Sequence, residues 1–340
     1  MHIAAPQISI IVPTRRRPAK LANLLKCLAT QSLTGNAVFE TLIGIDGLDD
    51  PESVAVSQDA RDLHGLTLHT WAFAQEGIAA IKNRLIEHAA GEILLFVNDD
   101  VRPAPDFIEQ HRNAHSHLLE KGRRAMVLGY SPWLVPEDGA ESQFDRLLAQ
   151  TSMVFFYDRM MAHADDRDRD WGFRHAWNLN LSVPADAVRA VGGFQESLCE
   201  CCYEDIELGY RLSIRESLPV LFRPGARADH DHRYTPAGYL EREQRLGRSA
   251  AVFAETCPEC AQTVFGLNLL SDEHLAYCKQ YVENESRREP EMLPVFTGLA
   301  SRPADTWSGD EWIPLAYTQH LPLKRLAFRR GLLEAVEKRA

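Results

Sequence analysis

The sequence predicts an α/β protein built on a mainly parallel β-sheet with helices on both faces. Short apolar runs alternate with amphipathic helical patterns along the first 130 residues, an order typical of strand–helix–strand units. The runs lack the polar alternation of half-exposed strands, which indicates strands that are buried on both faces. Proline and glycine mark the ends of these segments, where strands and helices stop.

The elements follow in order along the chain. Residues 8–12 form a β-branched run that ends at Pro13, and Pro18 then opens a helix at a position where its missing N–H costs nothing. The patterns predict further strands at 39–45, 69–73, 93–97 and 125–128, and helices that begin at Ile78 and Pro105 and close at Gly91 and Gly122. Past residue 175 they predict order at 177–183, a helix at 206–217, a strand at 220–222 and a helix at 239–254.

Composition limits the class of protein. Of 340 residues, 45% are apolar and 25% are charged, which excludes a disordered chain or a disulfide-rich miniprotein. The net charge of −11, from 37 basic and 48 acidic side chains, disfavours nucleic acid as a partner, because nucleic-acid binding needs a basic surface. The length suits a core domain over residues 1–235 with a mostly helical extension over 236–340.

Apolar runs and cysteines indicate the compartment. Every apolar run is shorter than the ~20 residues that span a membrane, and the first residues do not follow the pattern of a signal peptide. Seven cysteines, an odd number, suggest thiols rather than a disulfide framework, so we expect a cytoplasmic protein. Two Cys-x-x-Cys pairs leave a zinc site as the alternative to buried thiols at Cys199, Cys202, Cys257 and Cys260.

Polar segments follow three of the predicted strands. Thr14 and three arginines come after Pro13, Asp46 ends the second strand, and Asn98-Asp99-Asp100 follows the strand at 93–97. Ligands of parallel α/β sheets bind beyond the carboxyl ends of the strands, so we expect these segments to share one site. Adjacent carboxylates suit Mg²⁺ or Mn²⁺ that bridges substrate phosphates, and arginines suit a diphosphate. Each segment taken alone is also explained as turn chemistry or an exposed loop.

Acids and histidines recur later in the chain. Glu204 and Asp205 stand at the start of a predicted helix, where one would serve as a general base or both would merely favour the helix dipole. His230 and His232 flank Asp231, and such histidines either complete a divalent-metal site or have a structural role. The sequence contains no glycine-rich dinucleotide fingerprint and no P-loop, which disfavours those kinds of phosphate binding.

In their order along the chain, these segments resemble the family-2 glycosyltransferases of the GT-A fold, over about residues 7–235. Seven features of the family have counterparts at family-like spacing: V-P-T-x-x-R, a second-strand aspartate, A-x-N-R, D-x-D, G-G-F, E-D-x-[DE]-L-x-x-R and a late histidine. The counterparts here are, in order, Val12–Arg17, Asp46, Ala80–Arg84, Asn98–Asp100, Gly192–Phe194, Glu204–Arg211 and His230.

The resemblance implies inverting transfer of a sugar from a nucleotide-diphosphate sugar to an acceptor hydroxyl, assisted by Mn²⁺ or Mg²⁺. It implies Asp205 as the general base, with Glu204 as the alternative or an acceptor ligand, and it implies Asp100 and His230 as metal ligands. A base beside a cationic metal site is expected to stay ionised at neutral pH. The implied donor ligands are Pro13, Thr14, Arg15, Arg17, Asp46, Lys82, Arg84, Asn98 and Asp99. The implied contacts to sugar or acceptor are Trp177, Asn178, Asn180 and Gly193, with a core position as the alternative for Trp177.

Departures from the family pattern keep some questions open. Asn98 stands at the first D-x-D position and brings no charge, and Gly47-Leu48 follows Asp46 where D-G-S is frequent in the family, so the nucleobase stays open. A nucleotidyltransferase and a non-catalytic nucleotide-sugar-binding protein are the alternative functions.

The expected partners are a nucleotide-diphosphate sugar and an acceptor that is a glycan, a lipid-linked molecule or a small molecule. The C-terminal segment combines leucines with basic side chains, which suits a helix packed on the protein or, alternatively, peripheral contact with the inner face of an anionic membrane. Its basic residues are Lys324, Arg325, Arg329, Arg330, Lys338 and Arg339.

Overall fold

The computed structural model describes residues 6–35, 38–136, 140–198, 202–307 and 309–338. This described chain divides into two compact units. The first unit consists of residues 1–132, 163–199 and 204–232, and the second of residues 133–162, 200–203 and 233–340. The last segment begins close to the predicted boundary at 235, and residues 133–162 pack with that segment rather than with the first unit. The boundary itself stays a prediction about where the catalytic part ends.

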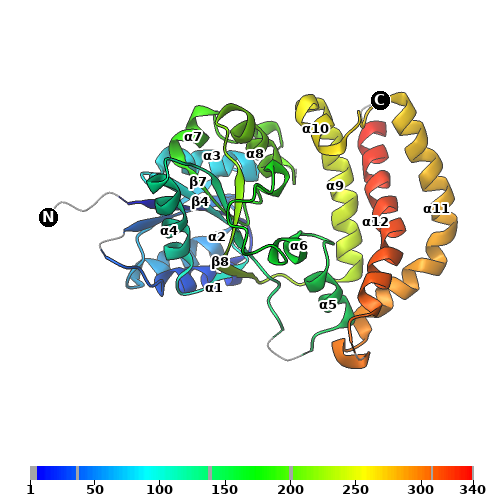
Figure 1. The fold of residues 1–340 in the computed structure, drawn as a ribbon, viewed down its shortest axis with the longest axis horizontal. Helices are drawn as coiled ribbons and strands as arrows, with labels where there is room; N and C mark the ends of the chain where they lie inside the picture. The colour runs from blue at the N-terminus through cyan, green and yellow to red at the C-terminus, as the bar shows by residue number, and fades with distance from the viewer. Residues whose placement is uncertain (1–5, 36–37, 137–139, 199–201, 308, 339–340) are drawn as a thin grey trace. The chain divides into compact units, whose positions relative to one another are not determined.

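Within the described residues, an eight-stranded mixed sheet forms the centre of the first unit (Figure 1). Its strands are β1 (Ile8–Thr14), β2 (Phe39–Asp46), β3 (Leu68–Phe73), β4 (Ile93–Val97), β5 (Val101–Pro103), β6 (Met126–Tyr130), β7 (Asn180–Pro184) and β8 (Val220–His230). They are ordered β3-β2-β1-β4-β7-β6-β8-β5. Neighbours are parallel, except that β7 runs antiparallel to β4 and β6, and β5 to β8. The predicted mainly parallel sheet is confirmed.

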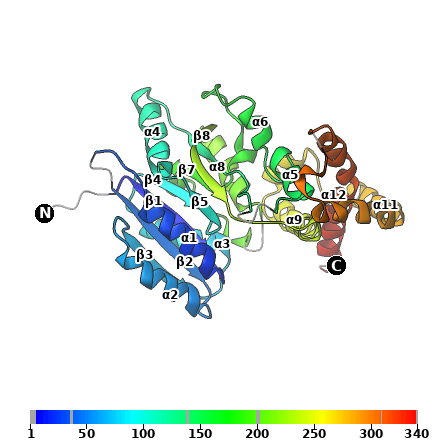
Figure 2. The same cartoon turned by 90° about the horizontal axis from the view of Figure 1, so that it is seen from below.

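Helices cover both faces of this sheet (Figure 2). One face carries α1 (Pro18–Ala29), α2 (Pro51–Asp59) and α4 (Phe107–Glu120), and the other carries α3 (Ile78–His88), α7 (Ala185–Ala190) and α8 (Glu204–Arg215). Ile81 of α3 packs directly over Gly44 of β2, and His111 of α4 reaches Ser182 of β7 from the opposite face. Every residue of β1 and β2 is buried, as expected of parallel strands with helices on both sides.

The structure corrects two local predictions. α3 ends at His88, so Gly91 is not its C-terminal cap. A Cβ at Gly91 would lie 2.5 Å from the backbone nitrogen of Ser9, which explains glycine there by the close approach of β1. The strand predicted at 220–222 continues to His230, because its polar second half pairs with β6 and β5. The sequence pattern missed this extension because only the first half is apolar.

The second unit is helical, as predicted for the C-terminal extension. Its helices are α5 (Gln143–Gln150), α6 (Tyr157–Met161), α9 (Pro236–Thr256), α10 (Pro258–Phe265), α11 (Asp272–Gly298) and α12 (Trp312–Glu337). α12 lies alongside α9 and α11 (Figure 1). A Cβ at Gly247 would lie 1.9 Å from the carbonyl oxygen of Phe328, and one at Gly331 would lie 1.8 Å from that of Gln244. The two glycines therefore allow α9 and α12 to cross in close contact.

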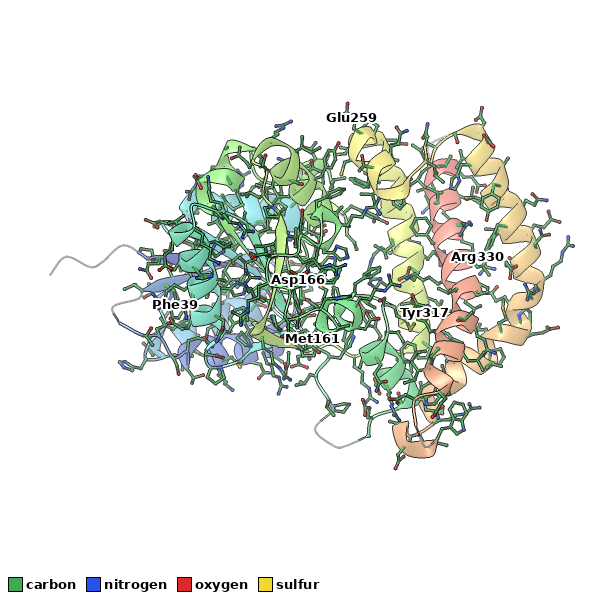
Figure 3. The ribbon with its side chains drawn as sticks, viewed as in Figure 1. Phe39, Met161, Asp166, Glu259, Tyr317 and Arg330 are labelled. Atoms are coloured by element: carbon green, nitrogen blue, oxygen red, sulfur yellow. The ribbon has the colours of Figure 1, made fainter. Side chains whose placement is uncertain are left out.

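The basic C-terminal segment belongs to α12 and packs within the second unit. Leu326 is buried, and the Arg330 guanidinium donates to Glu289 and Ser286 of α11 at 2.6–2.9 Å. Figure 3 labels Arg330 between α12 and α11. These contacts are the ones expected of a packed helix, and peripheral membrane contact stays a prediction; Arg339 lies outside the described residues. None of the described helices combines the length and the apolar character needed to cross a membrane.

Candidate active site at the edge of the sheet

Strand ends and one strand pairing bring the first acidic pair next to a histidine. Asp99 and Asp100 follow β4, which lies beside β1. β5 begins immediately afterwards and pairs antiparallel with β8, in a register that sets Val101 opposite His230. The backbone N–H of Asp231 also donates to the carbonyl oxygen of Asp100 at 2.7 Å. Residues that are far apart in the sequence therefore meet because the short β5 pairs with the end of β8.

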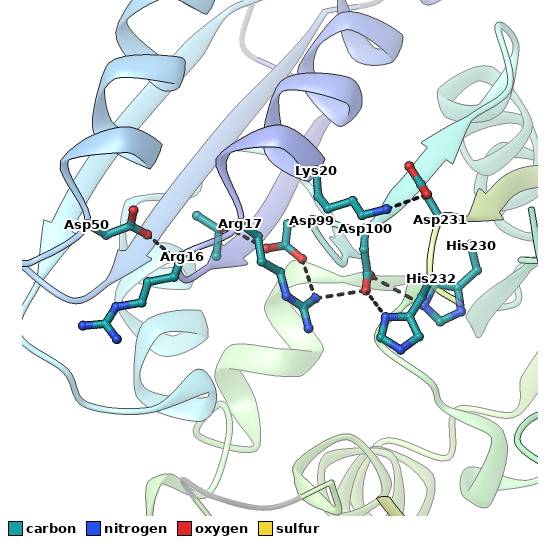
Figure 4. Close-up of polar contacts among 10 residues, drawn as sticks. Arg16, Arg17, Lys20, Asp50, Asp99, Asp100, His230, Asp231 and His232 are labelled. Carbon is teal, nitrogen blue, oxygen red and sulfur yellow. Dashed lines mark hydrogen bonds and ion pairs between the residues drawn. The ribbon is translucent and has the colours of Figure 1, made fainter. Parts of the chain in front are cut away.

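Hydroxyl and cationic side chains hold the two carboxylates (Figure 4). Thr14 Oγ1 donates to Asp99 Oδ2 at 2.7 Å. Arg17 Nη1 donates to Asp99 Oδ1 at 3.1 Å and to Asp100 Oδ2 at 2.9 Å. The loop that carries Arg17 bends at Arg16, whose φ of 50° lies in the left-handed region. The backbone N–H of Arg16 donates to Oδ2 of Asp50, which follows β2. The predicted donor ligands Thr14, Arg17 and Asp99 are therefore brought together with Asp100.

Two imidazoles face Asp100. His230 Nε2 lies 3.6 Å from Asp100 Oδ1, and His232 Nδ1 lies 3.6 Å from Asp100 Oδ2, both beyond hydrogen-bond distance. Burial by itself would raise the pKa of Asp100, but the two histidines and Arg17 together hold that pKa well below its usual range. Burial raises the pKa of Asp99 to about 6, because Arg17 offsets only part of the cost of desolvation. Asp100 is therefore the more acidic member of the pair.

Asp231 fixes the histidine segment in place. Its carboxylate accepts hydrogen bonds from Lys20 Nζ of α1 at 2.6 Å and from Arg102 Nε of β5 at 2.9 Å. Figure 4 shows the ion pair with Lys20 beside His230 and His232. Because the residue between the two histidines is anchored on both sides, the direction of their side chains toward Asp100 is fixed by the backbone.

The donor atoms around Asp100 fit a divalent cation. Asp100 Oδ1 is buried and makes no hydrogen bond, and an imidazole nitrogen lies 3.6 Å from it. Carboxylate oxygen and imidazole nitrogen both bind first-row divalent ions, and Mg²⁺-type sites combine one or two carboxylates with substrate phosphates. Across the described ranges, no group of three or more His, Cys, Asp or Glu side chains is arranged to hold an ion. Cys199 lies outside the described residues, so the zinc alternative stays a prediction.

A second cluster, made of Lys82, Asn178, Glu204 and Asp205, lies at the same edge of the sheet. It lies on the face of the sheet that α3 and α8 cover. Val97 at the end of β4 pairs with Asn180, so residues 178–180 come beside Asn98. The backbone N–H of Asn178 donates to the carboxylate of Asp205, which opens α8 and also accepts from the N–H of Ile206 at 2.7 Å. The second acidic pair is thereby joined to the strand end that carries the first.

Lys82 of α3 faces this second pair. Its Nζ lies 3.2 Å from Glu204 Oε1 and 4.9 Å from the centre of the Phe194 ring, and the Lys82 side chain is 2% exposed. Burial raises the pKa of Asp205, and the like charge of Glu204 raises it further, whereas Lys82 lowers it. Burial and Glu204 outweigh the single lysine, so the pKa of Asp205 is raised to about 7 in the metal-free protein, and its ionisation beside a bound metal stays a prediction.

Several polar atoms of this cluster are buried without a hydrogen bond. They are both side-chain amide atoms of Asn178 and Oε2 of Glu204, in residues that are 3% and 6% exposed. Each buried polar group that lacks a partner costs about 1–3 kcal/mol, so native proteins seldom leave one unsatisfied. An amide that both donates and accepts, next to a carboxylate that accepts, is satisfied by a ligand with hydroxyl groups. Beside Asp205, three buried polar atoms therefore have no hydrogen-bond partner among the described residues.

The structure also places the other three predicted sugar or acceptor residues. The Asn180 side chain is fully buried on the α4 face, where Oδ1 accepts from His111 Nε2 at 2.8 Å and Nδ2 donates to the carbonyl of Ala226 at 2.9 Å. Its hydrogen-bonding groups are used inside the fold. Trp177 is largely buried, which agrees with the core alternative. Gly193, with φ of 69°, shapes the turn after α7.

The remaining predicted donor ligands serve the loops around the site. Asp46 Oδ1 accepts from the N–H groups of Glu76 and Gly77 at 2.8 and 3.3 Å, which holds the start of α3. Arg15 and Arg84 are exposed at their tips and contact neighbouring polar side chains. Pro13 lies in β1 next to Thr14, and Asn98 is partly exposed at the end of β4. Lys82 is turned toward Glu204.

The resemblance gave no role to Asn83, and it chose His230 rather than His232 as the metal ligand. Asn83 Oδ1 accepts from the N–H of Phe194 at 2.7 Å and Nδ2 donates to its carbonyl at 2.9 Å, so Asn83 fixes the G-G-F segment to α3. Its signal was its place in the A-x-N-R motif. The signal for His232 was its spacing of two residues from His230, which puts both side chains on one side of an extended segment.

Comparison with known proteins gives a family match and several relatives. Residues 9–120 match the model of glycosyl transferase family 2. Validoxylamine A glucosyltransferase from Streptomyces hygroscopicus subsp. limoneus is 28% identical over 224 residues, which are 61% of this chain and 48% of that protein. The O-antigen biosynthesis protein RfbC of Myxococcus xanthus is 28% identical over 218 residues, covering 61% of this chain and 16% of that protein. The chain thus spans about half or less of the curated relatives it matches.

A solved structure supports the fold. The mannosyltransferase PcManGT from Pyrobaculum calidifontis, in complex with GDP-Man and Mn²⁺, superposes with a TM-score of 0.53 at 16% identity, covering 98% of this chain and 87% of that one. The α/β architecture with strand-end acids is therefore of the predicted GT-A type. Residues 9–120 are thus similar to glycosyl transferase family 2, and this match does not extend over the rest of the chain.

Proposed function

We propose that this protein transfers a sugar from a nucleotide-diphosphate sugar to an acceptor hydroxyl with inversion at the anomeric carbon. The observation that carries the proposal is the convergence of two acidic pairs at one edge of the sheet. The first pair includes an acidic carboxylate beside two imidazoles, and the second includes a carboxyl group of raised pKa beside unsatisfied polar atoms. The family match and the relatives named above support the same reaction class.

The first acidic pair is proposed to receive the donor diphosphate. Asp100 and His230 would hold a divalent cation, which when bound supplies positive charge to the leaving diphosphate. The mixed oxygen and nitrogen donors favour Mn²⁺ over Mg²⁺, because imidazole prefers transition ions. Arg17, half exposed and next to both carboxylates, is placed to pair with a diphosphate oxygen. The crystal complex of PcManGT with GDP-Man and Mn²⁺ supports this assignment by analogy of fold.

The second acidic pair is proposed to activate the acceptor. Asp205 takes the proton of the acceptor hydroxyl as the oxygen attacks the anomeric carbon, and the bond from that carbon to the diphosphate oxygen breaks with its electron pair on the diphosphate. Attack from the face opposite the leaving group inverts the configuration. Glu204 is the weaker candidate for the base because Lys82 already pairs with it. The amide of Asn178 and Glu204 Oε2 are proposed to bind hydroxyl groups of the sugar or the acceptor.

The acceptor class stays broad. The names of the relatives include a small-molecule acceptor, validoxylamine A, and the biosynthesis of O-antigen, so a small polyhydroxyl compound and a glycan are both proposed as acceptor classes. The catalytic part is proposed to be the first unit, with the boundary near residue 235.

A donor panel tests the proposal. Thermal unfolding is measured with UDP-, GDP- and dTDP-sugars, each with and without Mn²⁺, because a ligand that binds only the folded state raises the unfolding temperature with its concentration. We expect one nucleotide series to stabilise the protein in the presence of Mn²⁺, and that donor to be consumed when hydroxylated acceptors are added. Stabilisation by none of these donors would contradict the proposed function.

A further inference from the structure

Lys82 is positioned differently from the other predicted donor ligands. Its charged end is buried beneath the site, between Glu204 Oε1 at 3.2 Å and the face of the Phe194 ring at 4.9 Å. Phe194 in turn meets Phe96 of β4 edge-on, with ring centres 5.3 Å apart. With 2% of its side chain exposed, Lys82 presents no donor group at the surface for a diphosphate.

The charges of this cluster do not balance. One ammonium group faces two neighbouring carboxylates, Glu204 and Asp205, and the Lys82 and Glu204 side chains are both buried. Charges buried together interact more strongly than in water, and two like charges side by side resist joint ionisation. Lys82 is hydrogen-bonded to Glu204, so the one ammonium group is paired with Glu204 rather than with Asp205. One proton is then left to enter and leave the cluster at Asp205.

We propose that Lys82 is a positioning residue of the general base, not a donor ligand: by neutralising Glu204, it makes Asp205 the carboxylate that accepts the proton of the acceptor. The proposal rests on the proposed function and deepens it, since it assigns the division of labour within the second acidic pair. It also accounts for the choice of a lysine at a position where α3 packs against α8, because an apolar residue there would leave Glu204 buried and unpaired.

Other charged groups near α8 face elsewhere. From α7, Arg189 donates to the carbonyls of Ile86 and Ala89, and Asp186 pairs with Arg124. On α8 itself, Glu207 pairs with Arg211. From the turn before β7, His175 Nδ1 bonds to the carbonyl of Trp171. Among the described residues, the main charged groups that act on Asp205 are therefore Glu204 and Lys82, together with the N–H groups of Ile206 and Asn178.

The test is the pH profile of transfer in Lys82→Met. Loss of the lysine charge raises the pKa of Asp205, so the rising limb of kcat moves to higher pH by about one unit, and kcat below the limb falls about tenfold. The KM of the donor stays within twofold of the wild-type value. A donor KM that rises tenfold while the limb stays in place would overturn the proposal and make Lys82 a donor ligand.

Companion variants separate charge from packing. Lys82→Arg keeps the charge and is expected to keep the limb near its wild-type pH. The double variant Lys82→Met with Glu204→Gln removes both charges, so the rising limb of its pH profile returns toward that of the wild type. If Lys82→Met does not fold, the double variant tests the proposal instead, because it leaves no unpaired Glu204 carboxylate buried. A double variant whose limb stays at the Lys82→Met position would contradict the proposal. Lys26→Met, at an exposed lysine of α1, is the matched control.

The proposed function and this inference fail in different ways. If the wild-type protein transfers no sugar from any donor, the proposed function is wrong. If the wild type transfers sugar but the pH profile of none of the Lys82 variants moves, only the role of Lys82 is wrong.

Discussion

Two pairs of adjacent acids, Asp99-Asp100 and Glu204-Asp205, look alike in the sequence and differ in the fold. The first pair is surrounded by an exposed arginine and two histidines, and these lower the pKa of Asp100. The second pair has a single buried lysine, and burial raises the pKa of Asp205. An acid of low pKa is suited to hold a cation, and one of raised pKa is suited to exchange a proton. The surroundings, not the residue type, separate the two roles.

The largest expected effect comes from removing Asp205, the proposed proton acceptor. Asp205→Asn keeps the size of the side chain but takes away its basicity, so we expect kcat to fall by about 10³-fold with donor affinity unchanged. Donor binding is measured by calorimetry and transfer by release of the nucleoside diphosphate. Glu204→Gln, tested in parallel, is expected to lose less activity, and the reverse order of the two effects would move the base to Glu204.

The first pair is tested by Asp100→Ala. Without this carboxylate the proposed cation loses its main protein ligand, so we expect the Mn²⁺-dependent part of donor binding to disappear, with at least a tenfold loss of affinity. Titration of the donor at several Mn²⁺ concentrations measures the effect. Asp231→Asn is the comparison variant, since Asp231 braces the same corner without facing the proposed ion. Equal Mn²⁺ dependence in Asp100→Ala and the wild type would contradict the assignment.

Variants of Asn178 and Asn180 test which of the two asparagines belongs to the second cluster. Asn178→Ala removes an amide that lacks a partner in the protein, so the free energy of unfolding should change little while activity falls about tenfold. Asn180→Ala strips His111 and Ala226 of their partner, so unfolding should become about 1–3 kcal/mol easier. Chemical denaturation and steady-state kinetics on both variants measure these effects. A loss of stability at Asn178 larger than at Asn180 would reverse our interpretation.

The smallest expected effect is on the free energy of unfolding. Ionisation of Asp205 and ionisation of Asp100 are expected to change it in opposite directions. The raised pKa of Asp205 means that its ionisation costs stability as pH rises above the unfolded value of about 4 and through the folded one. The lowered pKa of Asp100 means that it contributes stability above that same unfolded value and loses it as pH falls. At pH 8, Asp205→Asn should therefore raise the unfolding temperature by a few degrees and Asp100→Asn should lower it, on the order of 1 kcal/mol each. Shifts of equal sign in thermal unfolding would contradict the contrast.

Much of the fold was predictable from the sequence, because its strands and helices follow local hydrophobic patterns. The buried runs of β1, β2 and β4 and the apolar faces of α1 and α3 depend on neighbours three or four residues away, which periodicity detects. The second half of β8 was not predictable, because residues 223–230 mix charged residues with proline, glycine and alanine and become a strand only through pairing with β5 and β6. Tertiary pairing overrides propensity in such a segment.

The site was predictable in part for the same reason. Thr14, Arg17, Asp99, Asp100, Asp205 and His230 stand in recognisable motifs, and the fold places them at one sheet edge. Lys82 also stands in such a motif, and Asn180 was implied by the same resemblance, yet the Lys82 side chain lies beneath Glu204 and the Asn180 side chain points to the α4 face. A motif names a position along the chain, whereas the face of the sheet on which a side chain emerges depends on register.

The order of residues along this chain was sufficient for its α/β class, its family resemblance and the set of acids at the strand ends, since these properties are local or follow from ordered motifs. Which acid is strong and which is weak depended on folding, because pKa values respond to burial and to charges contributed by distant segments. Lys82 comes from α3, His230 from the end of β8 and Arg17 from the loop after β1, and their distances to the four carboxylates exist only in the folded protein.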